Sequence, residues 1–449
     1  MSAPLTVAQT QRRFVLLTFL RWLPVGLVVP VTVLLASARG LSAAEIGLVL
    51  SAHGAVVIAL ELPTGGLADA LGRRPVLLLS GGCNLAGLLL LALAQGMPGF
   101  ALAYAVIGVG RALDSGPLEA WFVDAVHAAD PRADTTPGLA RAGAADGLSL
   151  ALGALLGGGL PLVLDSGSDR ALAAPFLVAA ALTGVQLVAV VLLVVPVGAP
   201  RPDVGPLASV RQGVRDVPRV VRDAVRLARG DRALRLLLLL SAGTGGALVC
   251  IELLAPLRFA ALTGGEAEGG ASYSLVVAAG FLASAVGSTC CGRVRRALGT
   301  TGRATALLSV LGAAAMLALG LGATVWLLAL GGLLFYAVNG AAFPLRRQLL
   351  HTRVGAAQRA TVVSVSSLAL QLGGLVAMQG QARLYDAAGA GWAFGSAAAL
   401  MLVLAAVSLL LPEGGDPGEA EGASATSPAA ALEGPAAAAS AEPAAAPRA

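Results

Sequence analysis

The chain alternates long apolar runs with short polar connections. Counting apolar runs of about 18 residues or more predicts twelve helices, and each is long enough to cross ~30 Å of hydrocarbon at ~1.5 Å per residue. They fall into two sets of six, separated by one longer polar connection. The predicted spans are 14–36, 43–64, 75–95, 98–122, 143–164, 172–196, 234–258, 272–292, 303–321, 323–344, 359–380 and 391–412.

This pattern predicts an all-α integral membrane protein with two pseudo-symmetric six-helix bundles, at 14–199 and 234–412. A weak internal repeat agrees with the division. The connection after the eighth span, 292–299, has glycines at the same separation as Gly65 and Gly72 in the connection after the second span. Gene duplication leaves such a match in equivalent loops of two halves.

The basic residues orient the predicted spans. All 30 are arginine. With the amino terminus in the cytoplasm, the inside connections hold twenty-four arginines, Arg346 and Arg347 among them, and the outside connections hold four. Because basic residues accumulate in inside loops, we expect a multi-pass protein of the cell membrane with both termini in the cytoplasm.

Three polar segments lie outside the spans: the cytoplasmic amino terminus 1–13, a linker at 200–233 and a tail at 413–449. Arginines recur three or four residues apart in the linker, which indicates a helix that lies on anionic headgroups. Docking of a nucleic acid or a protein is the alternative. The Ala/Pro/Glu/Gly tail lacks the hydrophobic variety to pack, so we expect it to be disordered and cytoplasmic.

Composition excludes several classes of function. Hydrophobic residues make up 57% of the chain and charged residues 12%, against roughly a quarter charged in soluble proteins. No polar block is long enough to fold as a catalytic domain, so an enzyme is not expected. The four cysteines have no metal-ligand spacing and no external loop to cross-link. We expect no metal, no cofactor, no structural disulfide and no nucleic-acid partner.

Ionisable groups inside the hydrocarbon carry the most information about chemistry, because each costs at least ~2.5–3 kcal/mol at a helix centre unless it is paired or hydrated. Counting ~1.5 Å per residue from the cytoplasmic ends places Arg21, Arg111 and Asp114 at similar depth, so a buried arginine could face carboxylates. The groups are Arg21, Glu61, Arg111, Asp114, Glu119, Asp146 and Glu252.

These groups have two interpretations. Arg111 and Asp114 are three residues apart and could neutralise each other on a helix, so the groups could be static ion pairs that hold the first six helices together. Alternatively, one carboxylate, Glu61 or Asp114, takes up a proton during function. Glu252 has no obvious cation except Arg258, which makes it a candidate site for a proton or a cationic substrate. A structural role beside the kink expected at a nearby proline is the alternative.

The connection GGLADALGRRP, 65–75, resembles the G-x-L-A-D-x-x-G-R-R/K signature of the major facilitator superfamily. The residues that match include Gly65, Asp69, Gly72, Arg73 and Arg74, while an alanine stands where a basic residue is common. The resemblance implies a gating motif that latches the outward-facing state and permits helices to slide. It also implies a secondary transporter.

Two further runs resemble motifs of this superfamily. Residues 110–121, GRALDSGPLEAW, are similar to an arginine-containing motif proposed to assist proton coupling, with Asp114 and Ser115 in place of its usual Gln-Gly. The fifth span resembles the antiporter signature G-x-x-x-G-P-x-x-G-G through Gly153, Gly157 and Gly158, with serine for its first glycine and alanine for its proline. This likeness points to the bacterial drug:proton antiporter branch.

We therefore expect a monomeric, proton-coupled exporter of small amphipathic or hydrophobic molecules, with the proton gradient as its driving force and the lipid bilayer as its surroundings. An apolar cavity with one or two acidic groups suits such cargo. One alternative is an importer or facilitator of a metabolite, in which Glu252 and Arg111 bind the polar groups of that metabolite. A membrane sensor or scaffold that acts through the arginine-rich linker is another.

Overall fold

The computed structural model describes residues 5–64, 67–164, 169–196, 205, 208, 210–215, 222, 226, 229–352 and 359–412. Every regular element within these residues is a helix. Gly65, most of the linker expected at 200–233 and the whole tail expected at 413–449 lie outside the described residues. The helices are α1 (Val7–Val28), α2 (Thr32–Ala38), α3 (Ala43–Thr64), α4 (Leu67–Leu71), α5 (Arg73–Leu93), α6 (Gly96–Leu113), α7 (Pro117–Ala129), α8 (Thr136–Leu164), α9 (Asp169–Leu193), α11 (Arg232–Thr263), α12 (Glu266–Leu298), α13 (Thr301–Leu321), α14 (Val325–Thr352), α15 (Arg359–Ala388) and α16 (Ala390–Leu409).

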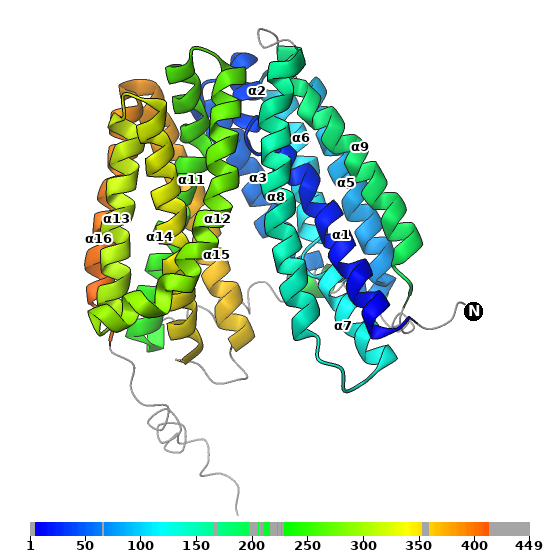
Figure 1. Cartoon of the computed structure of the whole chain (residues 1–449). Coiled ribbons are helices and arrows are strands. Elements are labelled where there is room, and N and C mark those ends of the chain that lie inside the picture. Colours follow the sequence, from blue (N-terminus) through cyan, green and yellow to red (C-terminus); the bar gives the residue numbers. More distant parts are fainter. Residues whose placement is uncertain are drawn as a thin grey trace, which may run out of the picture.

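The helices form two bundles (Figure 1). The N-terminal bundle holds α1 to α9, in which α1 packs along α8, and α5 packs along α6 and α9. The C-terminal bundle holds α11 to α16, in which α11 packs along α15, and α13 along α16. The all-α, two-bundle fold expected from the sequence is confirmed.

Eleven helical stretches in the described part of the chain are long and apolar enough to cross a membrane. The first combines α1 with α2, and the fourth combines α6 with α7. The 30-residue α15 is not among the eleven. Two of its polar side chains bond to neighbouring helices: Gln379 bonds to α3, and Ser366 to α11. Counting α15 for its length, the described residues contain six long helical stretches in each bundle.

Helix α1 begins at Val7, about two turns before the start expected at residue 14. The Thr6 hydroxyl accepts a hydrogen bond from the Gln9 amide at 3.2 Å, and the Gln9 side chain accepts one from the Thr6 amide at 3.0 Å. This reciprocal pair is a capping box. The arginines at 12 and 13 are therefore part of the first helix and not of a loose terminus.

The chain enters and leaves the bundles at the same end (Figure 1), where α1 begins and α16 finishes. We call it the terminal end. The opposite end, where α2 lies, is the sealed end, because the two bundles meet there through α3 with α15 and α8 with α12.

Polar contacts join the bundles at the sealed end. The Asp386 carboxylate of α15 accepts hydrogen bonds from the amides of Ala43 at 3.1 Å and Ala44 at 2.8 Å, so it caps the first turn of α3 from the other bundle. The Gln379 amide donates to the Gly47 carbonyl at 3.1 Å and to the Ser51 hydroxyl at 2.6 Å. These bonds satisfy the polar groups that contact between helices would otherwise leave unpaired.

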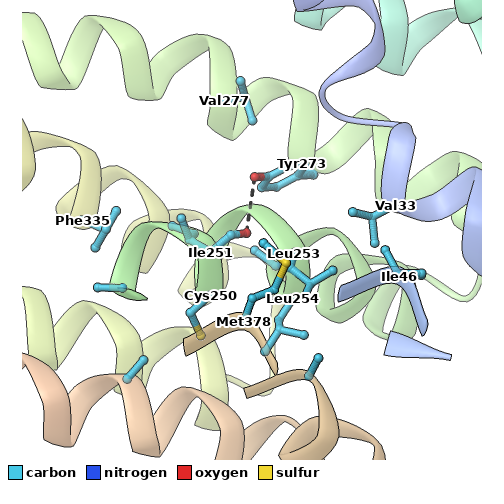
Figure 2. Close-up of a cluster of buried hydrophobic side chains, with 14 of the residues drawn as sticks. Val33, Ile46, Cys250, Ile251, Leu253, Leu254, Tyr273, Val277, Phe335 and Met378 are labelled. Carbon is cyan, nitrogen blue, oxygen red and sulfur yellow. Dashed lines mark hydrogen bonds between the residues drawn. The ribbon is translucent and has the colours of Figure 1, made fainter. Parts of the chain in front are cut away.

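Apolar side chains close the sealed end beneath these contacts. Figure 2 shows Val33 and Ile46 of the N-terminal bundle beside Leu253, Leu254 and Met378 of the C-terminal bundle, and all five belong to one buried cluster. The two bundles thus share a single hydrophobic core at this end.

The repeated turn is visible in the backbone. Gly72 before α5 has φ +90° and Gly299 after α12 has φ +80°. Residues with a Cβ rarely adopt these angles, so glycine is required at both positions. Their ψ angles are 156° and −37°, so the two turns correspond in position but not in detailed shape.

Candidate functional site

A break divides the fourth span of the N-terminal bundle into α6 and α7. Helix α6 ends at Leu113, Asp114 caps it, and α7 begins at Pro117. Gly116 between them has φ +96°, a left-handed angle that glycine tolerates, and proline suits the first position of a helix because it lacks an amide hydrogen. The run Asp114-Ser-Gly-Pro117 therefore stops one helix and starts the next inside the membrane span.

Arg21 of α1 reaches this break. Its Nε lies 2.5 Å from Asp114 Oδ2, and its Nη2 donates to the Asp114 carbonyl at 3.1 Å. The two side chains are only 15% and 11% exposed. Each charge compensates the other in a place where an isolated charge would be costly.

The direct ion-pair partner of Asp114 is Arg21 and not Arg111, which the sequence offered as a possible partner. Arg111 is exposed, and although it lies close enough to act on Asp114 through its charge, the direct partner is Arg21. The three-residue spacing applies within a helix, and Asp114 lies just beyond the end of α6. The break turns its carboxylate towards α1.

A second carboxylate faces the same arginine. Asp146 on α8 is half-buried and senses the charge of Arg21. Its Oδ1 is buried and has no hydrogen-bond partner among the described residues. We define Arg21, Asp114 and Asp146 as the charge triad. The sequence did not single out Asp146 among the ionisable groups. Its proximity to Arg21 arises only because α8 packs against α1.

Glu61 and Glu119 lie on either side of the break. The half-buried Glu61 at the end of α3 accepts a hydrogen bond from the Ser115 hydroxyl at 3.3 Å. Glu119 is exposed in the first turn of α7, where a negative charge is favoured by the helix dipole. Neither carboxylate contacts Arg21 directly within the described residues.

Glu252 is not isolated as the sequence indicated. It lies on α11 between the buried Ile251 and Leu253, and its own side chain is exposed. Surrounding protein nevertheless desolvates it, and it acts electrostatically on the hydroxyls of Tyr273 and Tyr336. An accessible side chain surrounded by protein is typical of a residue that lines an internal space between helices.

Arg258, the cation suggested for Glu252, bonds elsewhere. Its Nη2 donates at 2.9 Å to the carbonyl of Gly322, which caps the end of α13. The tyrosines are therefore the polar neighbours of Glu252 that the structure identifies.

The turn that resembles a gating motif lies at the terminal end. Arg73 opens α5, and its Nε lies 3.6 Å from Asp124 Oδ2 on α7. Arg74 is half-buried beside it, and Asp69 lies on α4. Gly65 lies outside the described residues. The sequence did not indicate Asp124 as a partner of Arg73, because the two residues lie on different helices, α7 and α5.

The small residues of α8 make two different contacts. A Cβ on Gly153 would lie 2.6 Å from the Leu23 carbonyl oxygen, and one on Gly157 would overlap the backbone at Leu27, so both allow α8 to lie against α1. A Cβ on Gly158 would instead meet Ser274 of α12 and lie 2.7 Å from the Gly270 oxygen. Gly158 thus belongs to the contact between the bundles.

Sequence reasoning missed one site altogether. Arg346 on α14 was counted in a loop, but it is half-buried against α11. Its Nη1 donates to the Thr244 hydroxyl and, at 3.4 Å, to the Leu240 carbonyl. It also lines a cavity together with hydroxyls of α11 and α15. The sequence analysis placed Arg346 in an inside loop because the predicted span ended at residue 344. In the structure α14 continues to Thr352.

The fold and these charges can now be compared with known proteins. A profile of the Major Facilitator Superfamily matches residues 14–266. The chain belongs to this superfamily, and it is a secondary transporter and not an enzyme. No curated protein sequence matches the chain.

Solved transporters share its architecture. The nucleoside transporter NupG has a TM-score of 0.71 at 13% identity, covering 90% of this chain and 98% of that one. A peptide transporter, POT, has 0.68 at 16% identity, covering 90% and 94%. A D-xylose-proton symporter has 0.66 at 15% identity, covering 91% and 97%. At such identities the likeness shows the fold alone.

Proposed function

We propose that this transporter is a monomeric, proton-coupled exporter of small amphipathic or hydrophobic molecules in the cell membrane. The observation that carries the proposal is the charge triad, in which one half-buried arginine faces two carboxylates at a helix break. Broken helices near the middle of a membrane are where transporters of several folds place substrates and coupling ions.

The charges of the triad give a mechanism for coupling. With both carboxylates ionised, Arg21 pairs directly with Asp114, while Asp146 has no ion-pair partner among the described residues. An unpaired carboxylate is unfavourable in a low-dielectric setting. Uptake of one proton makes the set neutral. The protein changes between its two access states more easily when the triad is neutral than when it is charged. A proton that binds on one side of the membrane is therefore released on the other.

Alternating access requires that the sealed end open while the terminal end closes. The hydrogen bonds of Asp386 and Gln379 join the bundles in the present state. The turn with Asp69, Gly72, Arg73 and Arg74 would latch the other state, as its resemblance implies. If the arginine distribution sets topology, the terminal end is cytoplasmic and the sealed end faces outwards.

Two observations support export. The fifth span resembles the antiporter signature, and α8 uses those glycines both against α1 and against the other bundle. Import of a metabolite is the second candidate. The similar structures are titled as nucleoside, peptide and D-xylose-proton transporters, but their cargoes belong to proteins at most 16% identical to this one.

The proposal is tested in inside-out membrane vesicles with an imposed pH gradient and a panel of fluorescent dyes and antibiotics. Accumulation that depends on both the protein and an acidic interior establishes proton antiport. Accumulation driven by the opposite gradient establishes symport and replaces export by import. Equal rates with and without any gradient contradict proton coupling.

A further inference from the structure

The C-terminal bundle contains a cavity of about 250 Å³ in the half nearer the terminal end. Polar side chains from three helices line it: Ser241 and Thr244 from α11, Arg346 and Arg347 from α14, and Ser366 and Ser367 from α15. Leu237 and Leu370 contribute apolar walls. The cavity therefore combines two arginines, one half-buried and one exposed, with several hydroxyl groups and hydrocarbon.

Arg346 is only partly used by the protein. Its Nε donates to the Ala342 carbonyl at 3.4 Å, and its Nη1 bonds to α11. Its Nη2 has no acceptor among the described residues. Because a guanidinium carries five N–H groups in a fixed fork, two well-placed donors remain for a molecule in the cavity.

Among the described residues, Arg346 forms no ion pair. No carboxylate of the described residues lies within 4.0 Å of it. Glu252, the acidic residue within the apolar part of α11, lies eight residues beyond Thr244, which is about 12 Å along the helix. Arginine stays protonated even when buried, so the cavity holds an uncompensated positive charge.

The hydroxyl groups add a second set of donors. The Ser241 and Ser366 hydroxyls lie 2.9 Å apart, and Ser241 also bonds to the Leu237 carbonyl at 2.9 Å. Ser367 is exposed at the same cavity. Hydroxyl protons rotate freely, so these groups can turn towards an acceptor that enters.

We propose that this cavity binds the acidic group of the cargo, a carboxylate or a comparable monoanion, with the apolar part of the cargo lying along the leucine walls. A carboxylate matches the two remaining N–H groups of Arg346 and the serine hydroxyls. The proposal rests on the transport function proposed above and gives it a substrate class, amphipathic organic acids.

Binding is measured with the full-length protein in nanodiscs of phosphatidylcholine, which has no net charge. The probes are tritiated 2-naphthoate and its neutral counterpart, 2-naphthamide. We expect wild type to bind naphthoate at least about tenfold more tightly than naphthamide, and Arg346→Gln to remove that preference, since a hydrogen bond to a charge is lost. Arg346→Lys should retain part of it, because the charge remains but the fork does not.

The matched control is Arg296→Gln, an exposed arginine near the end of α12, which should bind as wild type. If Arg346→Gln does not fold, Ser366→Ala serves in its place. This variant keeps the charge and should weaken naphthoate binding about threefold. Naphthamide binding equal to naphthoate binding in wild type overturns the proposal, and so does unchanged naphthoate affinity in a folded Arg346→Gln protein.

A lipid headgroup is the other source of an anion. In nanodiscs with phosphatidylglycerol, unchanged naphthoate affinity supports a cargo site, and strong competition assigns the cavity to lipid and overturns the cargo proposal. Gradient-driven transport of neutral or cationic cargo alone also overturns it but leaves proton-coupled transport standing. Naphthoate binding without any gradient-driven transport supports the site and contradicts the proposed coupling.

Discussion

Each bundle contains an arginine within a candidate membrane span that bonds to another part of the bundle. The two arginines, Arg21 and Arg346, differ in the groups that surround them. Arg21 in the N-terminal bundle contacts Asp114 and faces Asp146. Arg346 in the C-terminal bundle contacts a hydroxyl and backbone carbonyls, without a carboxylate within 4.0 Å among the described residues. The related halves of the fold therefore carry opposite charge balances.

The difference suggests a division of labour. The N-terminal set has more carboxylates than cations, so a proton can complete its charge balance. The C-terminal site has a cation in excess, so an anion can complete its balance. In both cases the missing partner is a species that the protein would transport, which is why neither set needs to be neutral on its own.

The largest expected effect comes from breaking the N-terminal pair. Asp114→Asn leaves Arg21 without its ion-pair partner, and loss of one member of a buried pair costs about 3–5 kcal/mol. We expect gradient-driven transport in proteoliposomes to fall at least about thirtyfold. Asp130→Asn, at an exposed position after α7, should transport as wild type.

The double variant Arg21→Gln/Asp114→Asn separates a static pair from a coupling group. It removes both charges, so protein stability should return towards wild type. Proton-driven transport should stay lost, while cargo exchange without a gradient should recover. Full recovery of proton-driven transport would assign the pair a structural role only.

The second prediction makes the C-terminal site resemble the N-terminal one. Thr244→Asp places a carboxylate beside Arg346 and supplies the missing counter-charge. Naphthoate binding should weaken about tenfold, because the new carboxylate occupies the guanidinium. Thr244→Asn changes shape similarly without adding charge, and equal losses in the two variants would contradict the electrostatic explanation.

The third prediction concerns the contact between the bundles. Gly158→Ala adds a methyl group against Ser274 and Gly270, whereas Gly159→Ala adds one in open space. The first change should shift the spin-label distance between Ser37 and Glu266 towards longer values, and the second should not. The same distance distribution in both variants would show that α8 and α12 adjust locally.

The smallest effect is expected at Glu252. Glu252→Gln removes an ionisable group near Tyr273 and Tyr336 but keeps its shape. Proton-driven transport should fall about threefold with expression unchanged, because the proposed mechanism assigns the main coupling to the triad and this variant removes only one further ionisable group. Unchanged transport would confine proton coupling to the N-terminal bundle and sharpen the contrast between the halves.

Much of the fold was predictable because lipid imposes a simple rule. A span must be helical and mostly apolar, so runs such as 234–258 and 391–412 identify α11 and α16 directly. Errors arose at the ends and breaks. The capping box at Thr6 starts α1 early, and the Asp114-Ser-Gly-Pro117 turn divides a run that the apolar count treated as one helix.

The candidate site was predictable in its residue types but not in its pairings. Charges within apolar runs drew attention to Arg21, Asp114 and Glu252 because buried charge is costly. Which acid meets Arg21, and that Arg346 lies in a cavity, depend on α1 packing along α8 and on α14 packing near α11. Those contacts join residues about 100 positions apart, and no local pattern encodes them.

The sequence by itself determined the class of protein, since hydrophobic length, arginine placement and the turn at 65–75 follow from local chemistry and from the lipid surroundings. Only the tertiary structure decided the charge balance of each half. An ion pair requires two groups within about 4 Å, and that proximity arises when helices distant in the chain pack together. The contrast between a compensated Arg21 and an uncompensated Arg346 is therefore a property of the folded bundles.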